Sequence, residues 1–189
     1  MISKLKAYYI SHKGKVRANN EDSIRIGSIL INDSQIDEPK LAEINVDSGL
    51  WLAVADGLGG HSNGEVASGV AVSAIDKLAE TDLIELNQKS VAKTLLQELQ
   101  SRIELGDVSA NLGTTLSALY IMNHSVYLIH IGDSRIYSLL PFQRLTKDDS
   151  VIEQLIDQGQ ISESMRKLHP LKNQLTHAIV GSSSLPVIK

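Results

Sequence analysis

The chain has 189 residues, of which 42% are hydrophobic and 21% charged, and its formal net charge is −4. These are values of a globular domain large enough for a core, and they give no basic footprint for nucleic acid. The chain has no cysteine, which excludes disulfides, thiolate zinc sites and a cysteine nucleophile and fits a reducing compartment. No apolar run is long enough for a membrane span or a signal peptide. We therefore expect a cytoplasmic protein that binds neither nucleic acid nor membranes.

The first third of the chain predicts strands joined by polar turns. Residues 5–11 and 24–26 are rich in strand formers, and His-Lys-Gly-Lys at 12–15 is typical of a turn. Residues 32–48 hold five acidic residues against one lysine, a balance of −4 that equals the charge of the whole chain. We expect this segment to be a solvated hairpin or loop and not a binding face.

Between the first two predicted strands, Arg17 precedes the acidic pair Glu21-Asp22. One interpretation is a surface ion pair, which contributes little to stability. The other is functional: a guanidinium group that binds an oxyanion, beside carboxylates that bind a metal ion. This stretch alone leaves both interpretations open.

An apolar run at residues 51–55 ends at Asp56-Gly57, and a glycine-rich turn follows. A sheet would hold the backbone of Asp56, so that its carboxylate has a fixed direction. The glycines would let a ligand approach the main chain, and the pair then suits a hard cation. An isolated strand that ends in Asp-Gly is more often a plain turn, so the other motifs must decide.

The middle of the chain predicts two helices and then a hairpin. Apolar residues recur at helical spacing over 64–78 and 88–105, and Gly106 would end the second helix. Both helices are expected to be packing elements. Strands follow at 112–121 and 126–131; within the latter, His130 is expected to be a hydrogen-bonded core residue and not a ligand.

Asp133 follows the strand at 126–131 as Asp56 follows its own strand, again beside a glycine, and a further strand is expected at 136–139. A turn is expected at 141–145, and a helix at about 151–158 would be capped by residues such as Asp148 and Asp149. The rest of the chain is polar and irregular up to a short apolar segment at 175–180.

The order of these elements predicts an α+β fold in which helices flank an antiparallel β-sandwich, because strands and helices do not alternate. Asp22, Asp56 and Asp133 each lie beside a strand end and can meet at one edge of such a sandwich. A cluster with oxygen ligands only selects Mg²⁺ or Mn²⁺ over zinc.

Four short motifs, in order across residues 5–180, resemble successive signatures of the metal-dependent Ser/Thr protein phosphatases (PPM family, type 2C), and of the compact bacterial members in particular. Each is weak alone, but their order and spacing together favour this family. The motifs are Arg17-Ala18-Asn19-Asn20-Glu21-Asp22, Val54-Ala55-Asp56-Gly57-Leu58-Gly59-Gly60-His61, Gly113-Thr114-Thr115 and Gly132-Asp133-Ser134-Arg135.

The resemblance implies a two-metal centre of Mg²⁺ or Mn²⁺ that hydrolyses phosphoserine and phosphothreonine in proteins, opposing a Ser/Thr kinase. Asp56 would bridge the two ions, the Gly57 carbonyl would bind one of them, and Asp22 would be a ligand or an acceptor beside them. Arg17 would clamp the substrate phosphate, and Asp133 would help to hold a weaker third ion. Residues 141–171 would correspond to the flap near the substrate.

Two features depart from the family pattern. Leu58 stands where eukaryotic members carry a candidate acid histidine, and His61 is not given that role. The pattern normally continues to two more metal carboxylates, whereas residues 181–189 resemble only the approach to them. The resemblance thus implies a single domain over 1–189 that is incomplete at its C-terminus and lacks the last strands.

From this shortening we expect one weakened metal site and open sheet edges that favour self-association. The alternative function is a catalytically impaired pseudophosphatase that acts as a regulatory binding module.

Overall fold

The computed structural model describes residues 4–46, 49–58, 63–78, 88–106, 110–122 and 125–182. In these ranges the elements, in chain order, are β1 (Lys4–Ser11), β2 (Asp22–Ile26), β3 (Ile29–Asn32), β4 (Ile36–Asn45), β5 (Leu50–Leu58), α1 (Gly64–Ala74), η1 (Ile75–Leu78), α2 (Gln88–Glu104), β6 (Gly113–Thr114), β7 (Leu116–Met122), β8 (Ser125–Ile131), β9 (Tyr137–Leu139), β10 (Phe142–Arg144), α3 (Val151–Asp157), η3 (Glu163–Met165) and β11 (Ile179–Val180).

The larger sheet is built around β5, the strand that carries Asp56. It pairs with β2, β6 and β7, while β3, β11 and β8 extend the sheet beyond these neighbours. All of these pairs are antiparallel. The predicted α+β fold with antiparallel sheets is therefore confirmed.

The second sheet consists, among the described residues, of β1 and β4. We predicted a solvated hairpin or loop at residues 32–48. The loop is wrong, because this segment contains the ten-residue strand β4. Ile36 and Ala42 are buried, and this burial gives the acidic segment a reason to form a strand. Its acidic side chains are exposed, as expected for a solvated segment.

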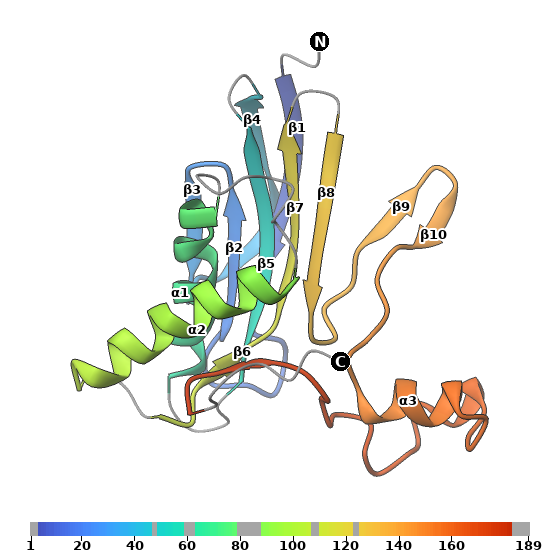
Figure 1. The fold of residues 1–189 in the computed structure, drawn as a ribbon. Coiled ribbons are helices and arrows are strands. Elements are labelled where there is room, and N and C mark those ends of the chain that lie inside the picture. Colours follow the sequence, from blue (N-terminus) through green and yellow to red (C-terminus); the bar gives the residue numbers. More distant parts are fainter. Residues whose placement is uncertain are drawn as a thin grey trace.

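Two apolar layers hold these elements together. Ile24, Ile26 and Ala42 pack between the two sheets, and a larger cluster fills the space between the large sheet and helices α1 and α2. In α2 the side chains of Val91 and Leu95 are fully buried, which confirms the predicted packing role of that helix. Figure 1 shows α1 and α2 lying across the large sheet, opposite β1 and β4.

Residues 137–165 form a separate lobe beside the larger sheet. Figure 1 shows the β9–β10 hairpin and α3 standing apart from the body, beyond β8. The turn predicted at 141–145 contains strand β10, which pairs with β9. Gly106, at φ +78°, ends α2 as predicted, and its N–H donates to the Ile103 carbonyl. No helix among the described residues has the length and apolar character needed to cross a membrane.

Candidate metal centre

Two of the predicted ligands, Asp22 and Asp56, are register partners on neighbouring strands. Asp22 opens β2 and faces Asp56 near the end of β5. The strands are antiparallel, so the start of one lies beside the end of the other. The two carboxyl groups are within hydrogen-bonding reach of each other. Sheet pairing thus creates a carboxylate pair from residues 34 positions apart in the sequence.

The backbone of Asp56 is clamped by the Gly-Thr-Thr motif. The amide of Asp56 donates to the hydroxyl of Thr115 at 3.0 Å, and the Thr115 amide donates to the Asp56 carbonyl at 2.9 Å. The Thr114 hydroxyl also donates to that carbonyl, at 3.1 Å. Both threonines are fully buried. The motif therefore fixes the position from which the Asp56 carboxylate projects.

Gly57 lies where three stretches of backbone meet. A Cβ on this residue would lie 2.1 Å from the Gly64 carbonyl oxygen and 2.7 Å from the Glu21 carbonyl oxygen. The Gly57 amide donates to the same Glu21 carbonyl at 3.0 Å. Only a glycine fits here, because any side chain would push the start of α1 away from the strands.

The acidic groups of the centre repel one another. Burial, followed by the negative charges of Asp22, Asp133 and Glu21, raises the pKa of Asp56 to about 6, against a smaller opposing effect of Arg17. Burial also raises the pKa of Asp22, although the hydrogen bond to Asp56 and the charge of Arg17 oppose this. Such crowding of partly buried carboxylates is relieved when a cation binds between them.

Two cavities border the Asp56 carboxylate. The larger, of about 360 Å³, brings in Asp133 and the backbone of Gly57, and the smaller, of about 170 Å³, brings in Asp22 and the loop after β1. Arg17, Glu21 and Asp56 line both. Four of the five predicted site residues thus line the larger cavity, and Asp22 joins them through the smaller one.

Residues 31–154 match the family described as Protein phosphatase 2C. The chain belongs to this family. It is 32% identical over 184 residues to the serine/threonine protein phosphatase PstP of Mycobacterium tuberculosis, which is 94% of this chain and 32% of that protein. It is 30% identical over 182 residues to the serine/threonine phosphatase stp of Listeria welshimeri, which is 92% of this chain and 66% of that protein. The chain therefore spans less than two thirds of PstP and about two thirds of stp.

Solved structures show the same fold. The crystal structure of the M. tuberculosis phosphatase PstP/Ppp has 29% identity and a TM-score of 0.69, covering 97% of this chain and 71% of that chain. The catalytic domain of PstP in complex with two manganese ions also has 29% identity, with a TM-score of 0.64 and coverage of 97% and 70%. The predicted PPM-type fold is confirmed.

Within this phosphatase 2C fold, the position of Arg17 agrees with both interpretations that the sequence left open, a surface ion pair and an oxyanion-binding group. Its guanidinium lies 3.7 Å from the Glu21 carboxylate, and its side chain is 66% exposed. It is thus a surface ion pair, but one that lies at the junction of the two cavities. Because the side chain is largely exposed and lines both cavities, its guanidinium can also bind an oxyanion there.

The contacts that position Asp133 are made by its sequence neighbours Gly132 and Ser134, and not by Asp22 or Asp56. The Gly132 amide donates to the Asp149 carboxylate at 2.9 Å, and the Asp149 amide donates to the Gly132 carbonyl at 2.7 Å. The Thr115 and Ser134 hydroxyls are 2.9 Å apart. Burial, followed by the charge of Asp148, raises the pKa of Asp133.

The prediction that Asp148 and Asp149 cap the following helix was wrong. Ser150 is the capping residue of α3, and its hydroxyl accepts from the Glu153 amide at 3.2 Å. Asp148 is instead a buried acceptor for Arg135, and Asp149 anchors the loop of Asp133. The run Thr-Lys-Asp-Asp-Ser contains three residue types that are common helix caps: Thr, Asp and Ser. Tertiary contacts engage the two aspartates, and the serine caps the helix.

Glu21 belongs to the acidic pair that the sequence singled out beside Arg17, but it was not among the predicted site residues. It lines both cavities, pairs with Arg17 and contributes to the raised pKa of Asp56. The signal was its place beside Asp22 in the first motif. His130 is hydrogen-bonded as predicted, with Nδ1 2.9 Å from the Ser117 hydroxyl and Nε2 2.9 Å from the Lys147 carbonyl, but it is half-buried and not part of the core. The predicted turn at 59–62 lies outside the described residues.

The donor set fits a divalent cation in kind but is sparse in number. Paired carboxylates with raised pKa values suit Mg²⁺ or Mn²⁺. Within the described ranges, however, no three Asp, Glu or His side chains come close enough together to hold a metal ion. The residues therefore fit the group, with fewer protein ligands converging than a closed site needs.

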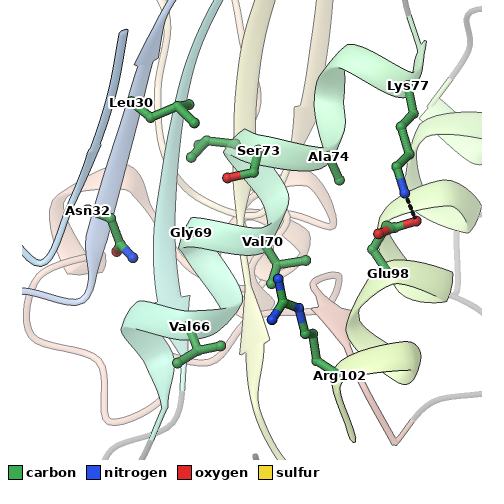
Figure 2. Close-up of a pocket in the computed structure, with 11 residues that line it drawn as sticks. Leu30, Asn32, Val66, Gly69, Val70, Ser73, Ala74, Lys77, Glu98 and Arg102 are labelled. Carbon is green, nitrogen blue, oxygen red and sulfur yellow. Dashed lines mark hydrogen bonds and ion pairs between the residues drawn. The ribbon is translucent and has the colours of Figure 1, made fainter. Parts of the chain in front are cut away.

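A further cavity, of about 370 Å³, lies elsewhere on the fold, between α1, α2 and β3. Figure 2 shows Val66 and Val70 of α1 lining it, and an ion pair between Lys77 and Glu98 at its rim. It shares no lining residue with the two cavities at Asp56. We assign it no part in the candidate centre.

Proposed function

We propose that the chain hydrolyses phosphoserine and phosphothreonine in proteins at a Mg²⁺ or Mn²⁺ centre. The observation that carries this proposal is the register pair Asp22 and Asp56, with its raised pKa values, in a member of the protein phosphatase 2C family. PstP, a relative, has been solved with two manganese ions. Metal ions of this kind, when bound, lower the pKa of a water molecule and neutralise phosphoryl oxygens.

Each site residue has a proposed role. Asp56, Asp22 and the Gly57 carbonyl would hold the two ions, and Asp133 would hold a weaker ion. Arg17 would bind the phosphate oxygens, an interaction that strengthens as charge develops in the transition state. The position of Arg17 between the two cavities supports this role.

We also propose that one metal position is weak in this chain. The support is that, among the described residues, no three potential ligand side chains converge. This observation keeps the second candidate function open, in which the chain retains the fold and binds partners without turnover. The single-domain assignment over 1–189 and the cytoplasmic location stay predictions from the sequence.

The discriminating experiment is turnover of p-nitrophenyl phosphate in excess Mn²⁺, with Asp56→Asn as the control. Turnover that the substitution abolishes would support the phosphatase. A folded protein with no turnover, at any Mn²⁺ concentration, would contradict it and favour the binding module. Circular dichroism of both proteins separates loss of chemistry from loss of fold.

The proposed partners are phosphorylated proteins made by an opposing Ser/Thr kinase, and a second copy of the chain. Self-association is supported by strands with a single described neighbour, among them β1, which pairs with β4, and β8, which pairs with β7. Tyr8 and Ile10 on β1 are 71% and 51% exposed. Sedimentation equilibrium tests this, because Ile10→Lys should shift the chain toward monomer. A wild-type chain that is monomeric at all concentrations would contradict it.

A further inference from the structure

The smaller cavity at Asp56 has a cationic side as well as an acidic one. Its acidic lining comes from Glu21, Asp22 and Asp56, whereas the loop after β1 contributes His12, Lys13 and Arg17. The loop segment at 12–20 contains three Lys or Arg residues and no acidic residue. With cations bound at the carboxylates, the net charge of this lining would favour an anion.

A second basic segment borders the centre. Residues 164–182 contain three Lys or Arg residues and no acidic residue, although the whole chain has a net charge of −4. Within this segment, Asn173 and Leu175 line the larger cavity. Lys167 and Lys172, which lie close to Asn173 in the sequence, are exposed to solvent. Neither lysine lines either cavity, and Arg166 is paired with Glu153 and Glu163, so the cations that line the cavities come from the β1–β2 loop.

The β1–β2 loop is held in place by hydrogen bonds, and its cations therefore have defined positions. The Lys13 ammonium donates to the Ala18 carbonyl at 3.1 Å, and the Gly14 amide donates to Nδ1 of His12 at 2.8 Å. The side-chain amide of Asn20 donates to the Ser11 hydroxyl and the Ser34 carbonyl, both at 2.7 Å. Such preorganisation lowers the entropic cost of binding a ligand at this loop.

The cationic partners in the loop are unequal. Nε2 of His12 lies 3.6 Å from the Asp37 carboxylate, which offsets its charge when the ring is protonated. Arg17 lies 3.7 Å from Glu21 and is assigned to the substrate phosphate. Among the described residues, the Lys13 side chain has one partner, the neutral carbonyl of Ala18. It is therefore the cation that can accept a second anion.

We propose that Lys13, which lines the smaller cavity from the exposed β1–β2 loop, forms a subsite for an acidic side chain next to the phosphorylated residue and binds its carboxylate. This assignment rests on the proposed phosphatase function, and it names the substrate class: phosphoproteins with Asp or Glu beside the phosphoresidue. Successive residues of an extended peptide advance about 3.3 Å, so neighbours reach adjoining cavities.

The test uses two phosphoserine peptides that differ only in Glu or Gln at the positions flanking the phosphoserine. We expect the wild-type chain to prefer the Glu peptide about fivefold in kcat/KM, and Lys13→Met to bring that ratio close to one. Lys6→Met is the matched control: Lys6 lies on β1, pairs with Glu43 at 3.4 Å and lines neither cavity. It should leave both the ratio and p-nitrophenyl phosphate turnover unchanged.

Binding separates this inference from the proposed function. The same peptides, carrying a non-hydrolysable phosphonate in place of the phosphate, are titrated by fluorescence anisotropy in Mn²⁺. If the chain turns over no substrate but still binds the Glu peptide more tightly through Lys13, the phosphatase proposal fails and the subsite stands. Equal binding and turnover of the Glu and Gln peptides would overturn the subsite.

Two further outcomes also overturn it. If Lys13→Met weakens the Glu and Gln peptides equally, Lys13 holds the loop and does not select the substrate. If a peptide with a second phosphoserine in place of Glu is preferred over the Glu peptide, the ligand is a phosphate group and not a carboxylate.

Discussion

Asp22 and Asp56 face each other across the β2–β5 pairing, with their carboxyl groups within hydrogen-bonding reach. The charge of one carboxylate raises the pKa of the other, and a cation bound between them relieves this repulsion. In the metal-free chain, burial and then the charge of Asp22 raise the pKa of Asp56 to about 6. A carboxylate pair that lowers the stability of the metal-free chain is typical of a ligand-binding site.

The stability of the metal-free chain should depend on Asp56 with a defined sign. Its pKa is raised to about 6 in the fold, so the folded chain binds more protons there than the unfolded chain between pH 4 and 6. This contribution to stability is therefore lost as the pH rises through 6. Asp56→Asn should stabilise the metal-free chain at pH 7.5 by up to about 1 kcal/mol after solvent screening.

Urea unfolding in EDTA at pH 5 and pH 7.5 measures this effect. Asp157→Asn, an exposed position on α3, is the control and should change stability little at either pH. In Mn²⁺ the sign should reverse, because the cation binds the ionised carboxylate. A destabilising Asp56→Asn in EDTA at pH 7.5 would show that the carboxylate is satisfied without metal.

Thr115 should couple the two sides of the centre. Its hydroxyl contacts both the Asp56 amide and the Ser134 hydroxyl, so Thr115→Val leaves a partly buried amide unpaired. We expect a loss of about 1–3 kcal/mol in stability and weaker Mn²⁺ binding, measured by urea unfolding and by electron paramagnetic resonance titration. Thr115→Ser keeps the hydroxyl and should retain most Mn²⁺ affinity. Equal Mn²⁺ affinity in the Val and Ser variants would rule out this coupling.

Gly57→Ala should be among the most damaging single-methyl additions in this chain. The new Cβ would lie 2.1 Å from the Gly64 carbonyl oxygen, so the start of α1 must move. We expect a loss of about 3 kcal/mol, measured by thermal and urea unfolding. Gly14→Ala is the matched control: at φ +79° with open space around its Cβ, it should cost about 1 kcal/mol. Similar costs at both positions would refute the steric explanation.

Asp148 should hold together the segments that form and flank the lobe of residues 137–165. Its buried carboxylate pairs with Arg135 and lies 3.5 Å from Arg166 and 3.9 Å from Arg144. Hydrogen bonding to Arg135 and the nearby guanidinium charges outweigh burial and lower the pKa of Asp148. Its stabilising contribution is thus present above the ordinary carboxyl range and is lost as the pH falls through the lowered pKa.

Asp148→Asn should therefore destabilise the chain by about 3 kcal/mol at pH 7, because it leaves partly buried guanidinium groups without their shared partner. Glu163→Gln is the comparison: Glu163 also pairs with Arg166, but its side chain is 69% exposed, and the loss should stay below about 1 kcal/mol. Urea unfolding at pH 7 measures both. A Glu163 variant as damaging as the Asp148 variant would contradict the role of burial.

Local sequence was sufficient for the elements whose pattern is internal to them. The four-residue spacing of Val91, Leu95 and Leu99 predicts α2 because a helix buries one stripe of its own side chains. The strand before Asp56 and the α+β class follow in the same way. The acidic strand β4 could not be predicted, because its charges are exposed and its apolar residues are ordered only by pairing with β1 and packing on the large sheet.

The sequence by itself determined which side chains form the candidate centre, since Arg17, Asp22, Asp56 and Asp133 stand in recognisable motifs. Only the tertiary structure decided how they meet. Antiparallel register placed Asp22 opposite Asp56, the close packing at Gly57 brought Glu21 into both cavities, and long-range hydrogen bonds made Asp149 an anchor and not a helix cap. The sequence specifies which charged and hydrogen-bonding groups the chain contains, but packing sets the distances between residues that are far apart along the chain.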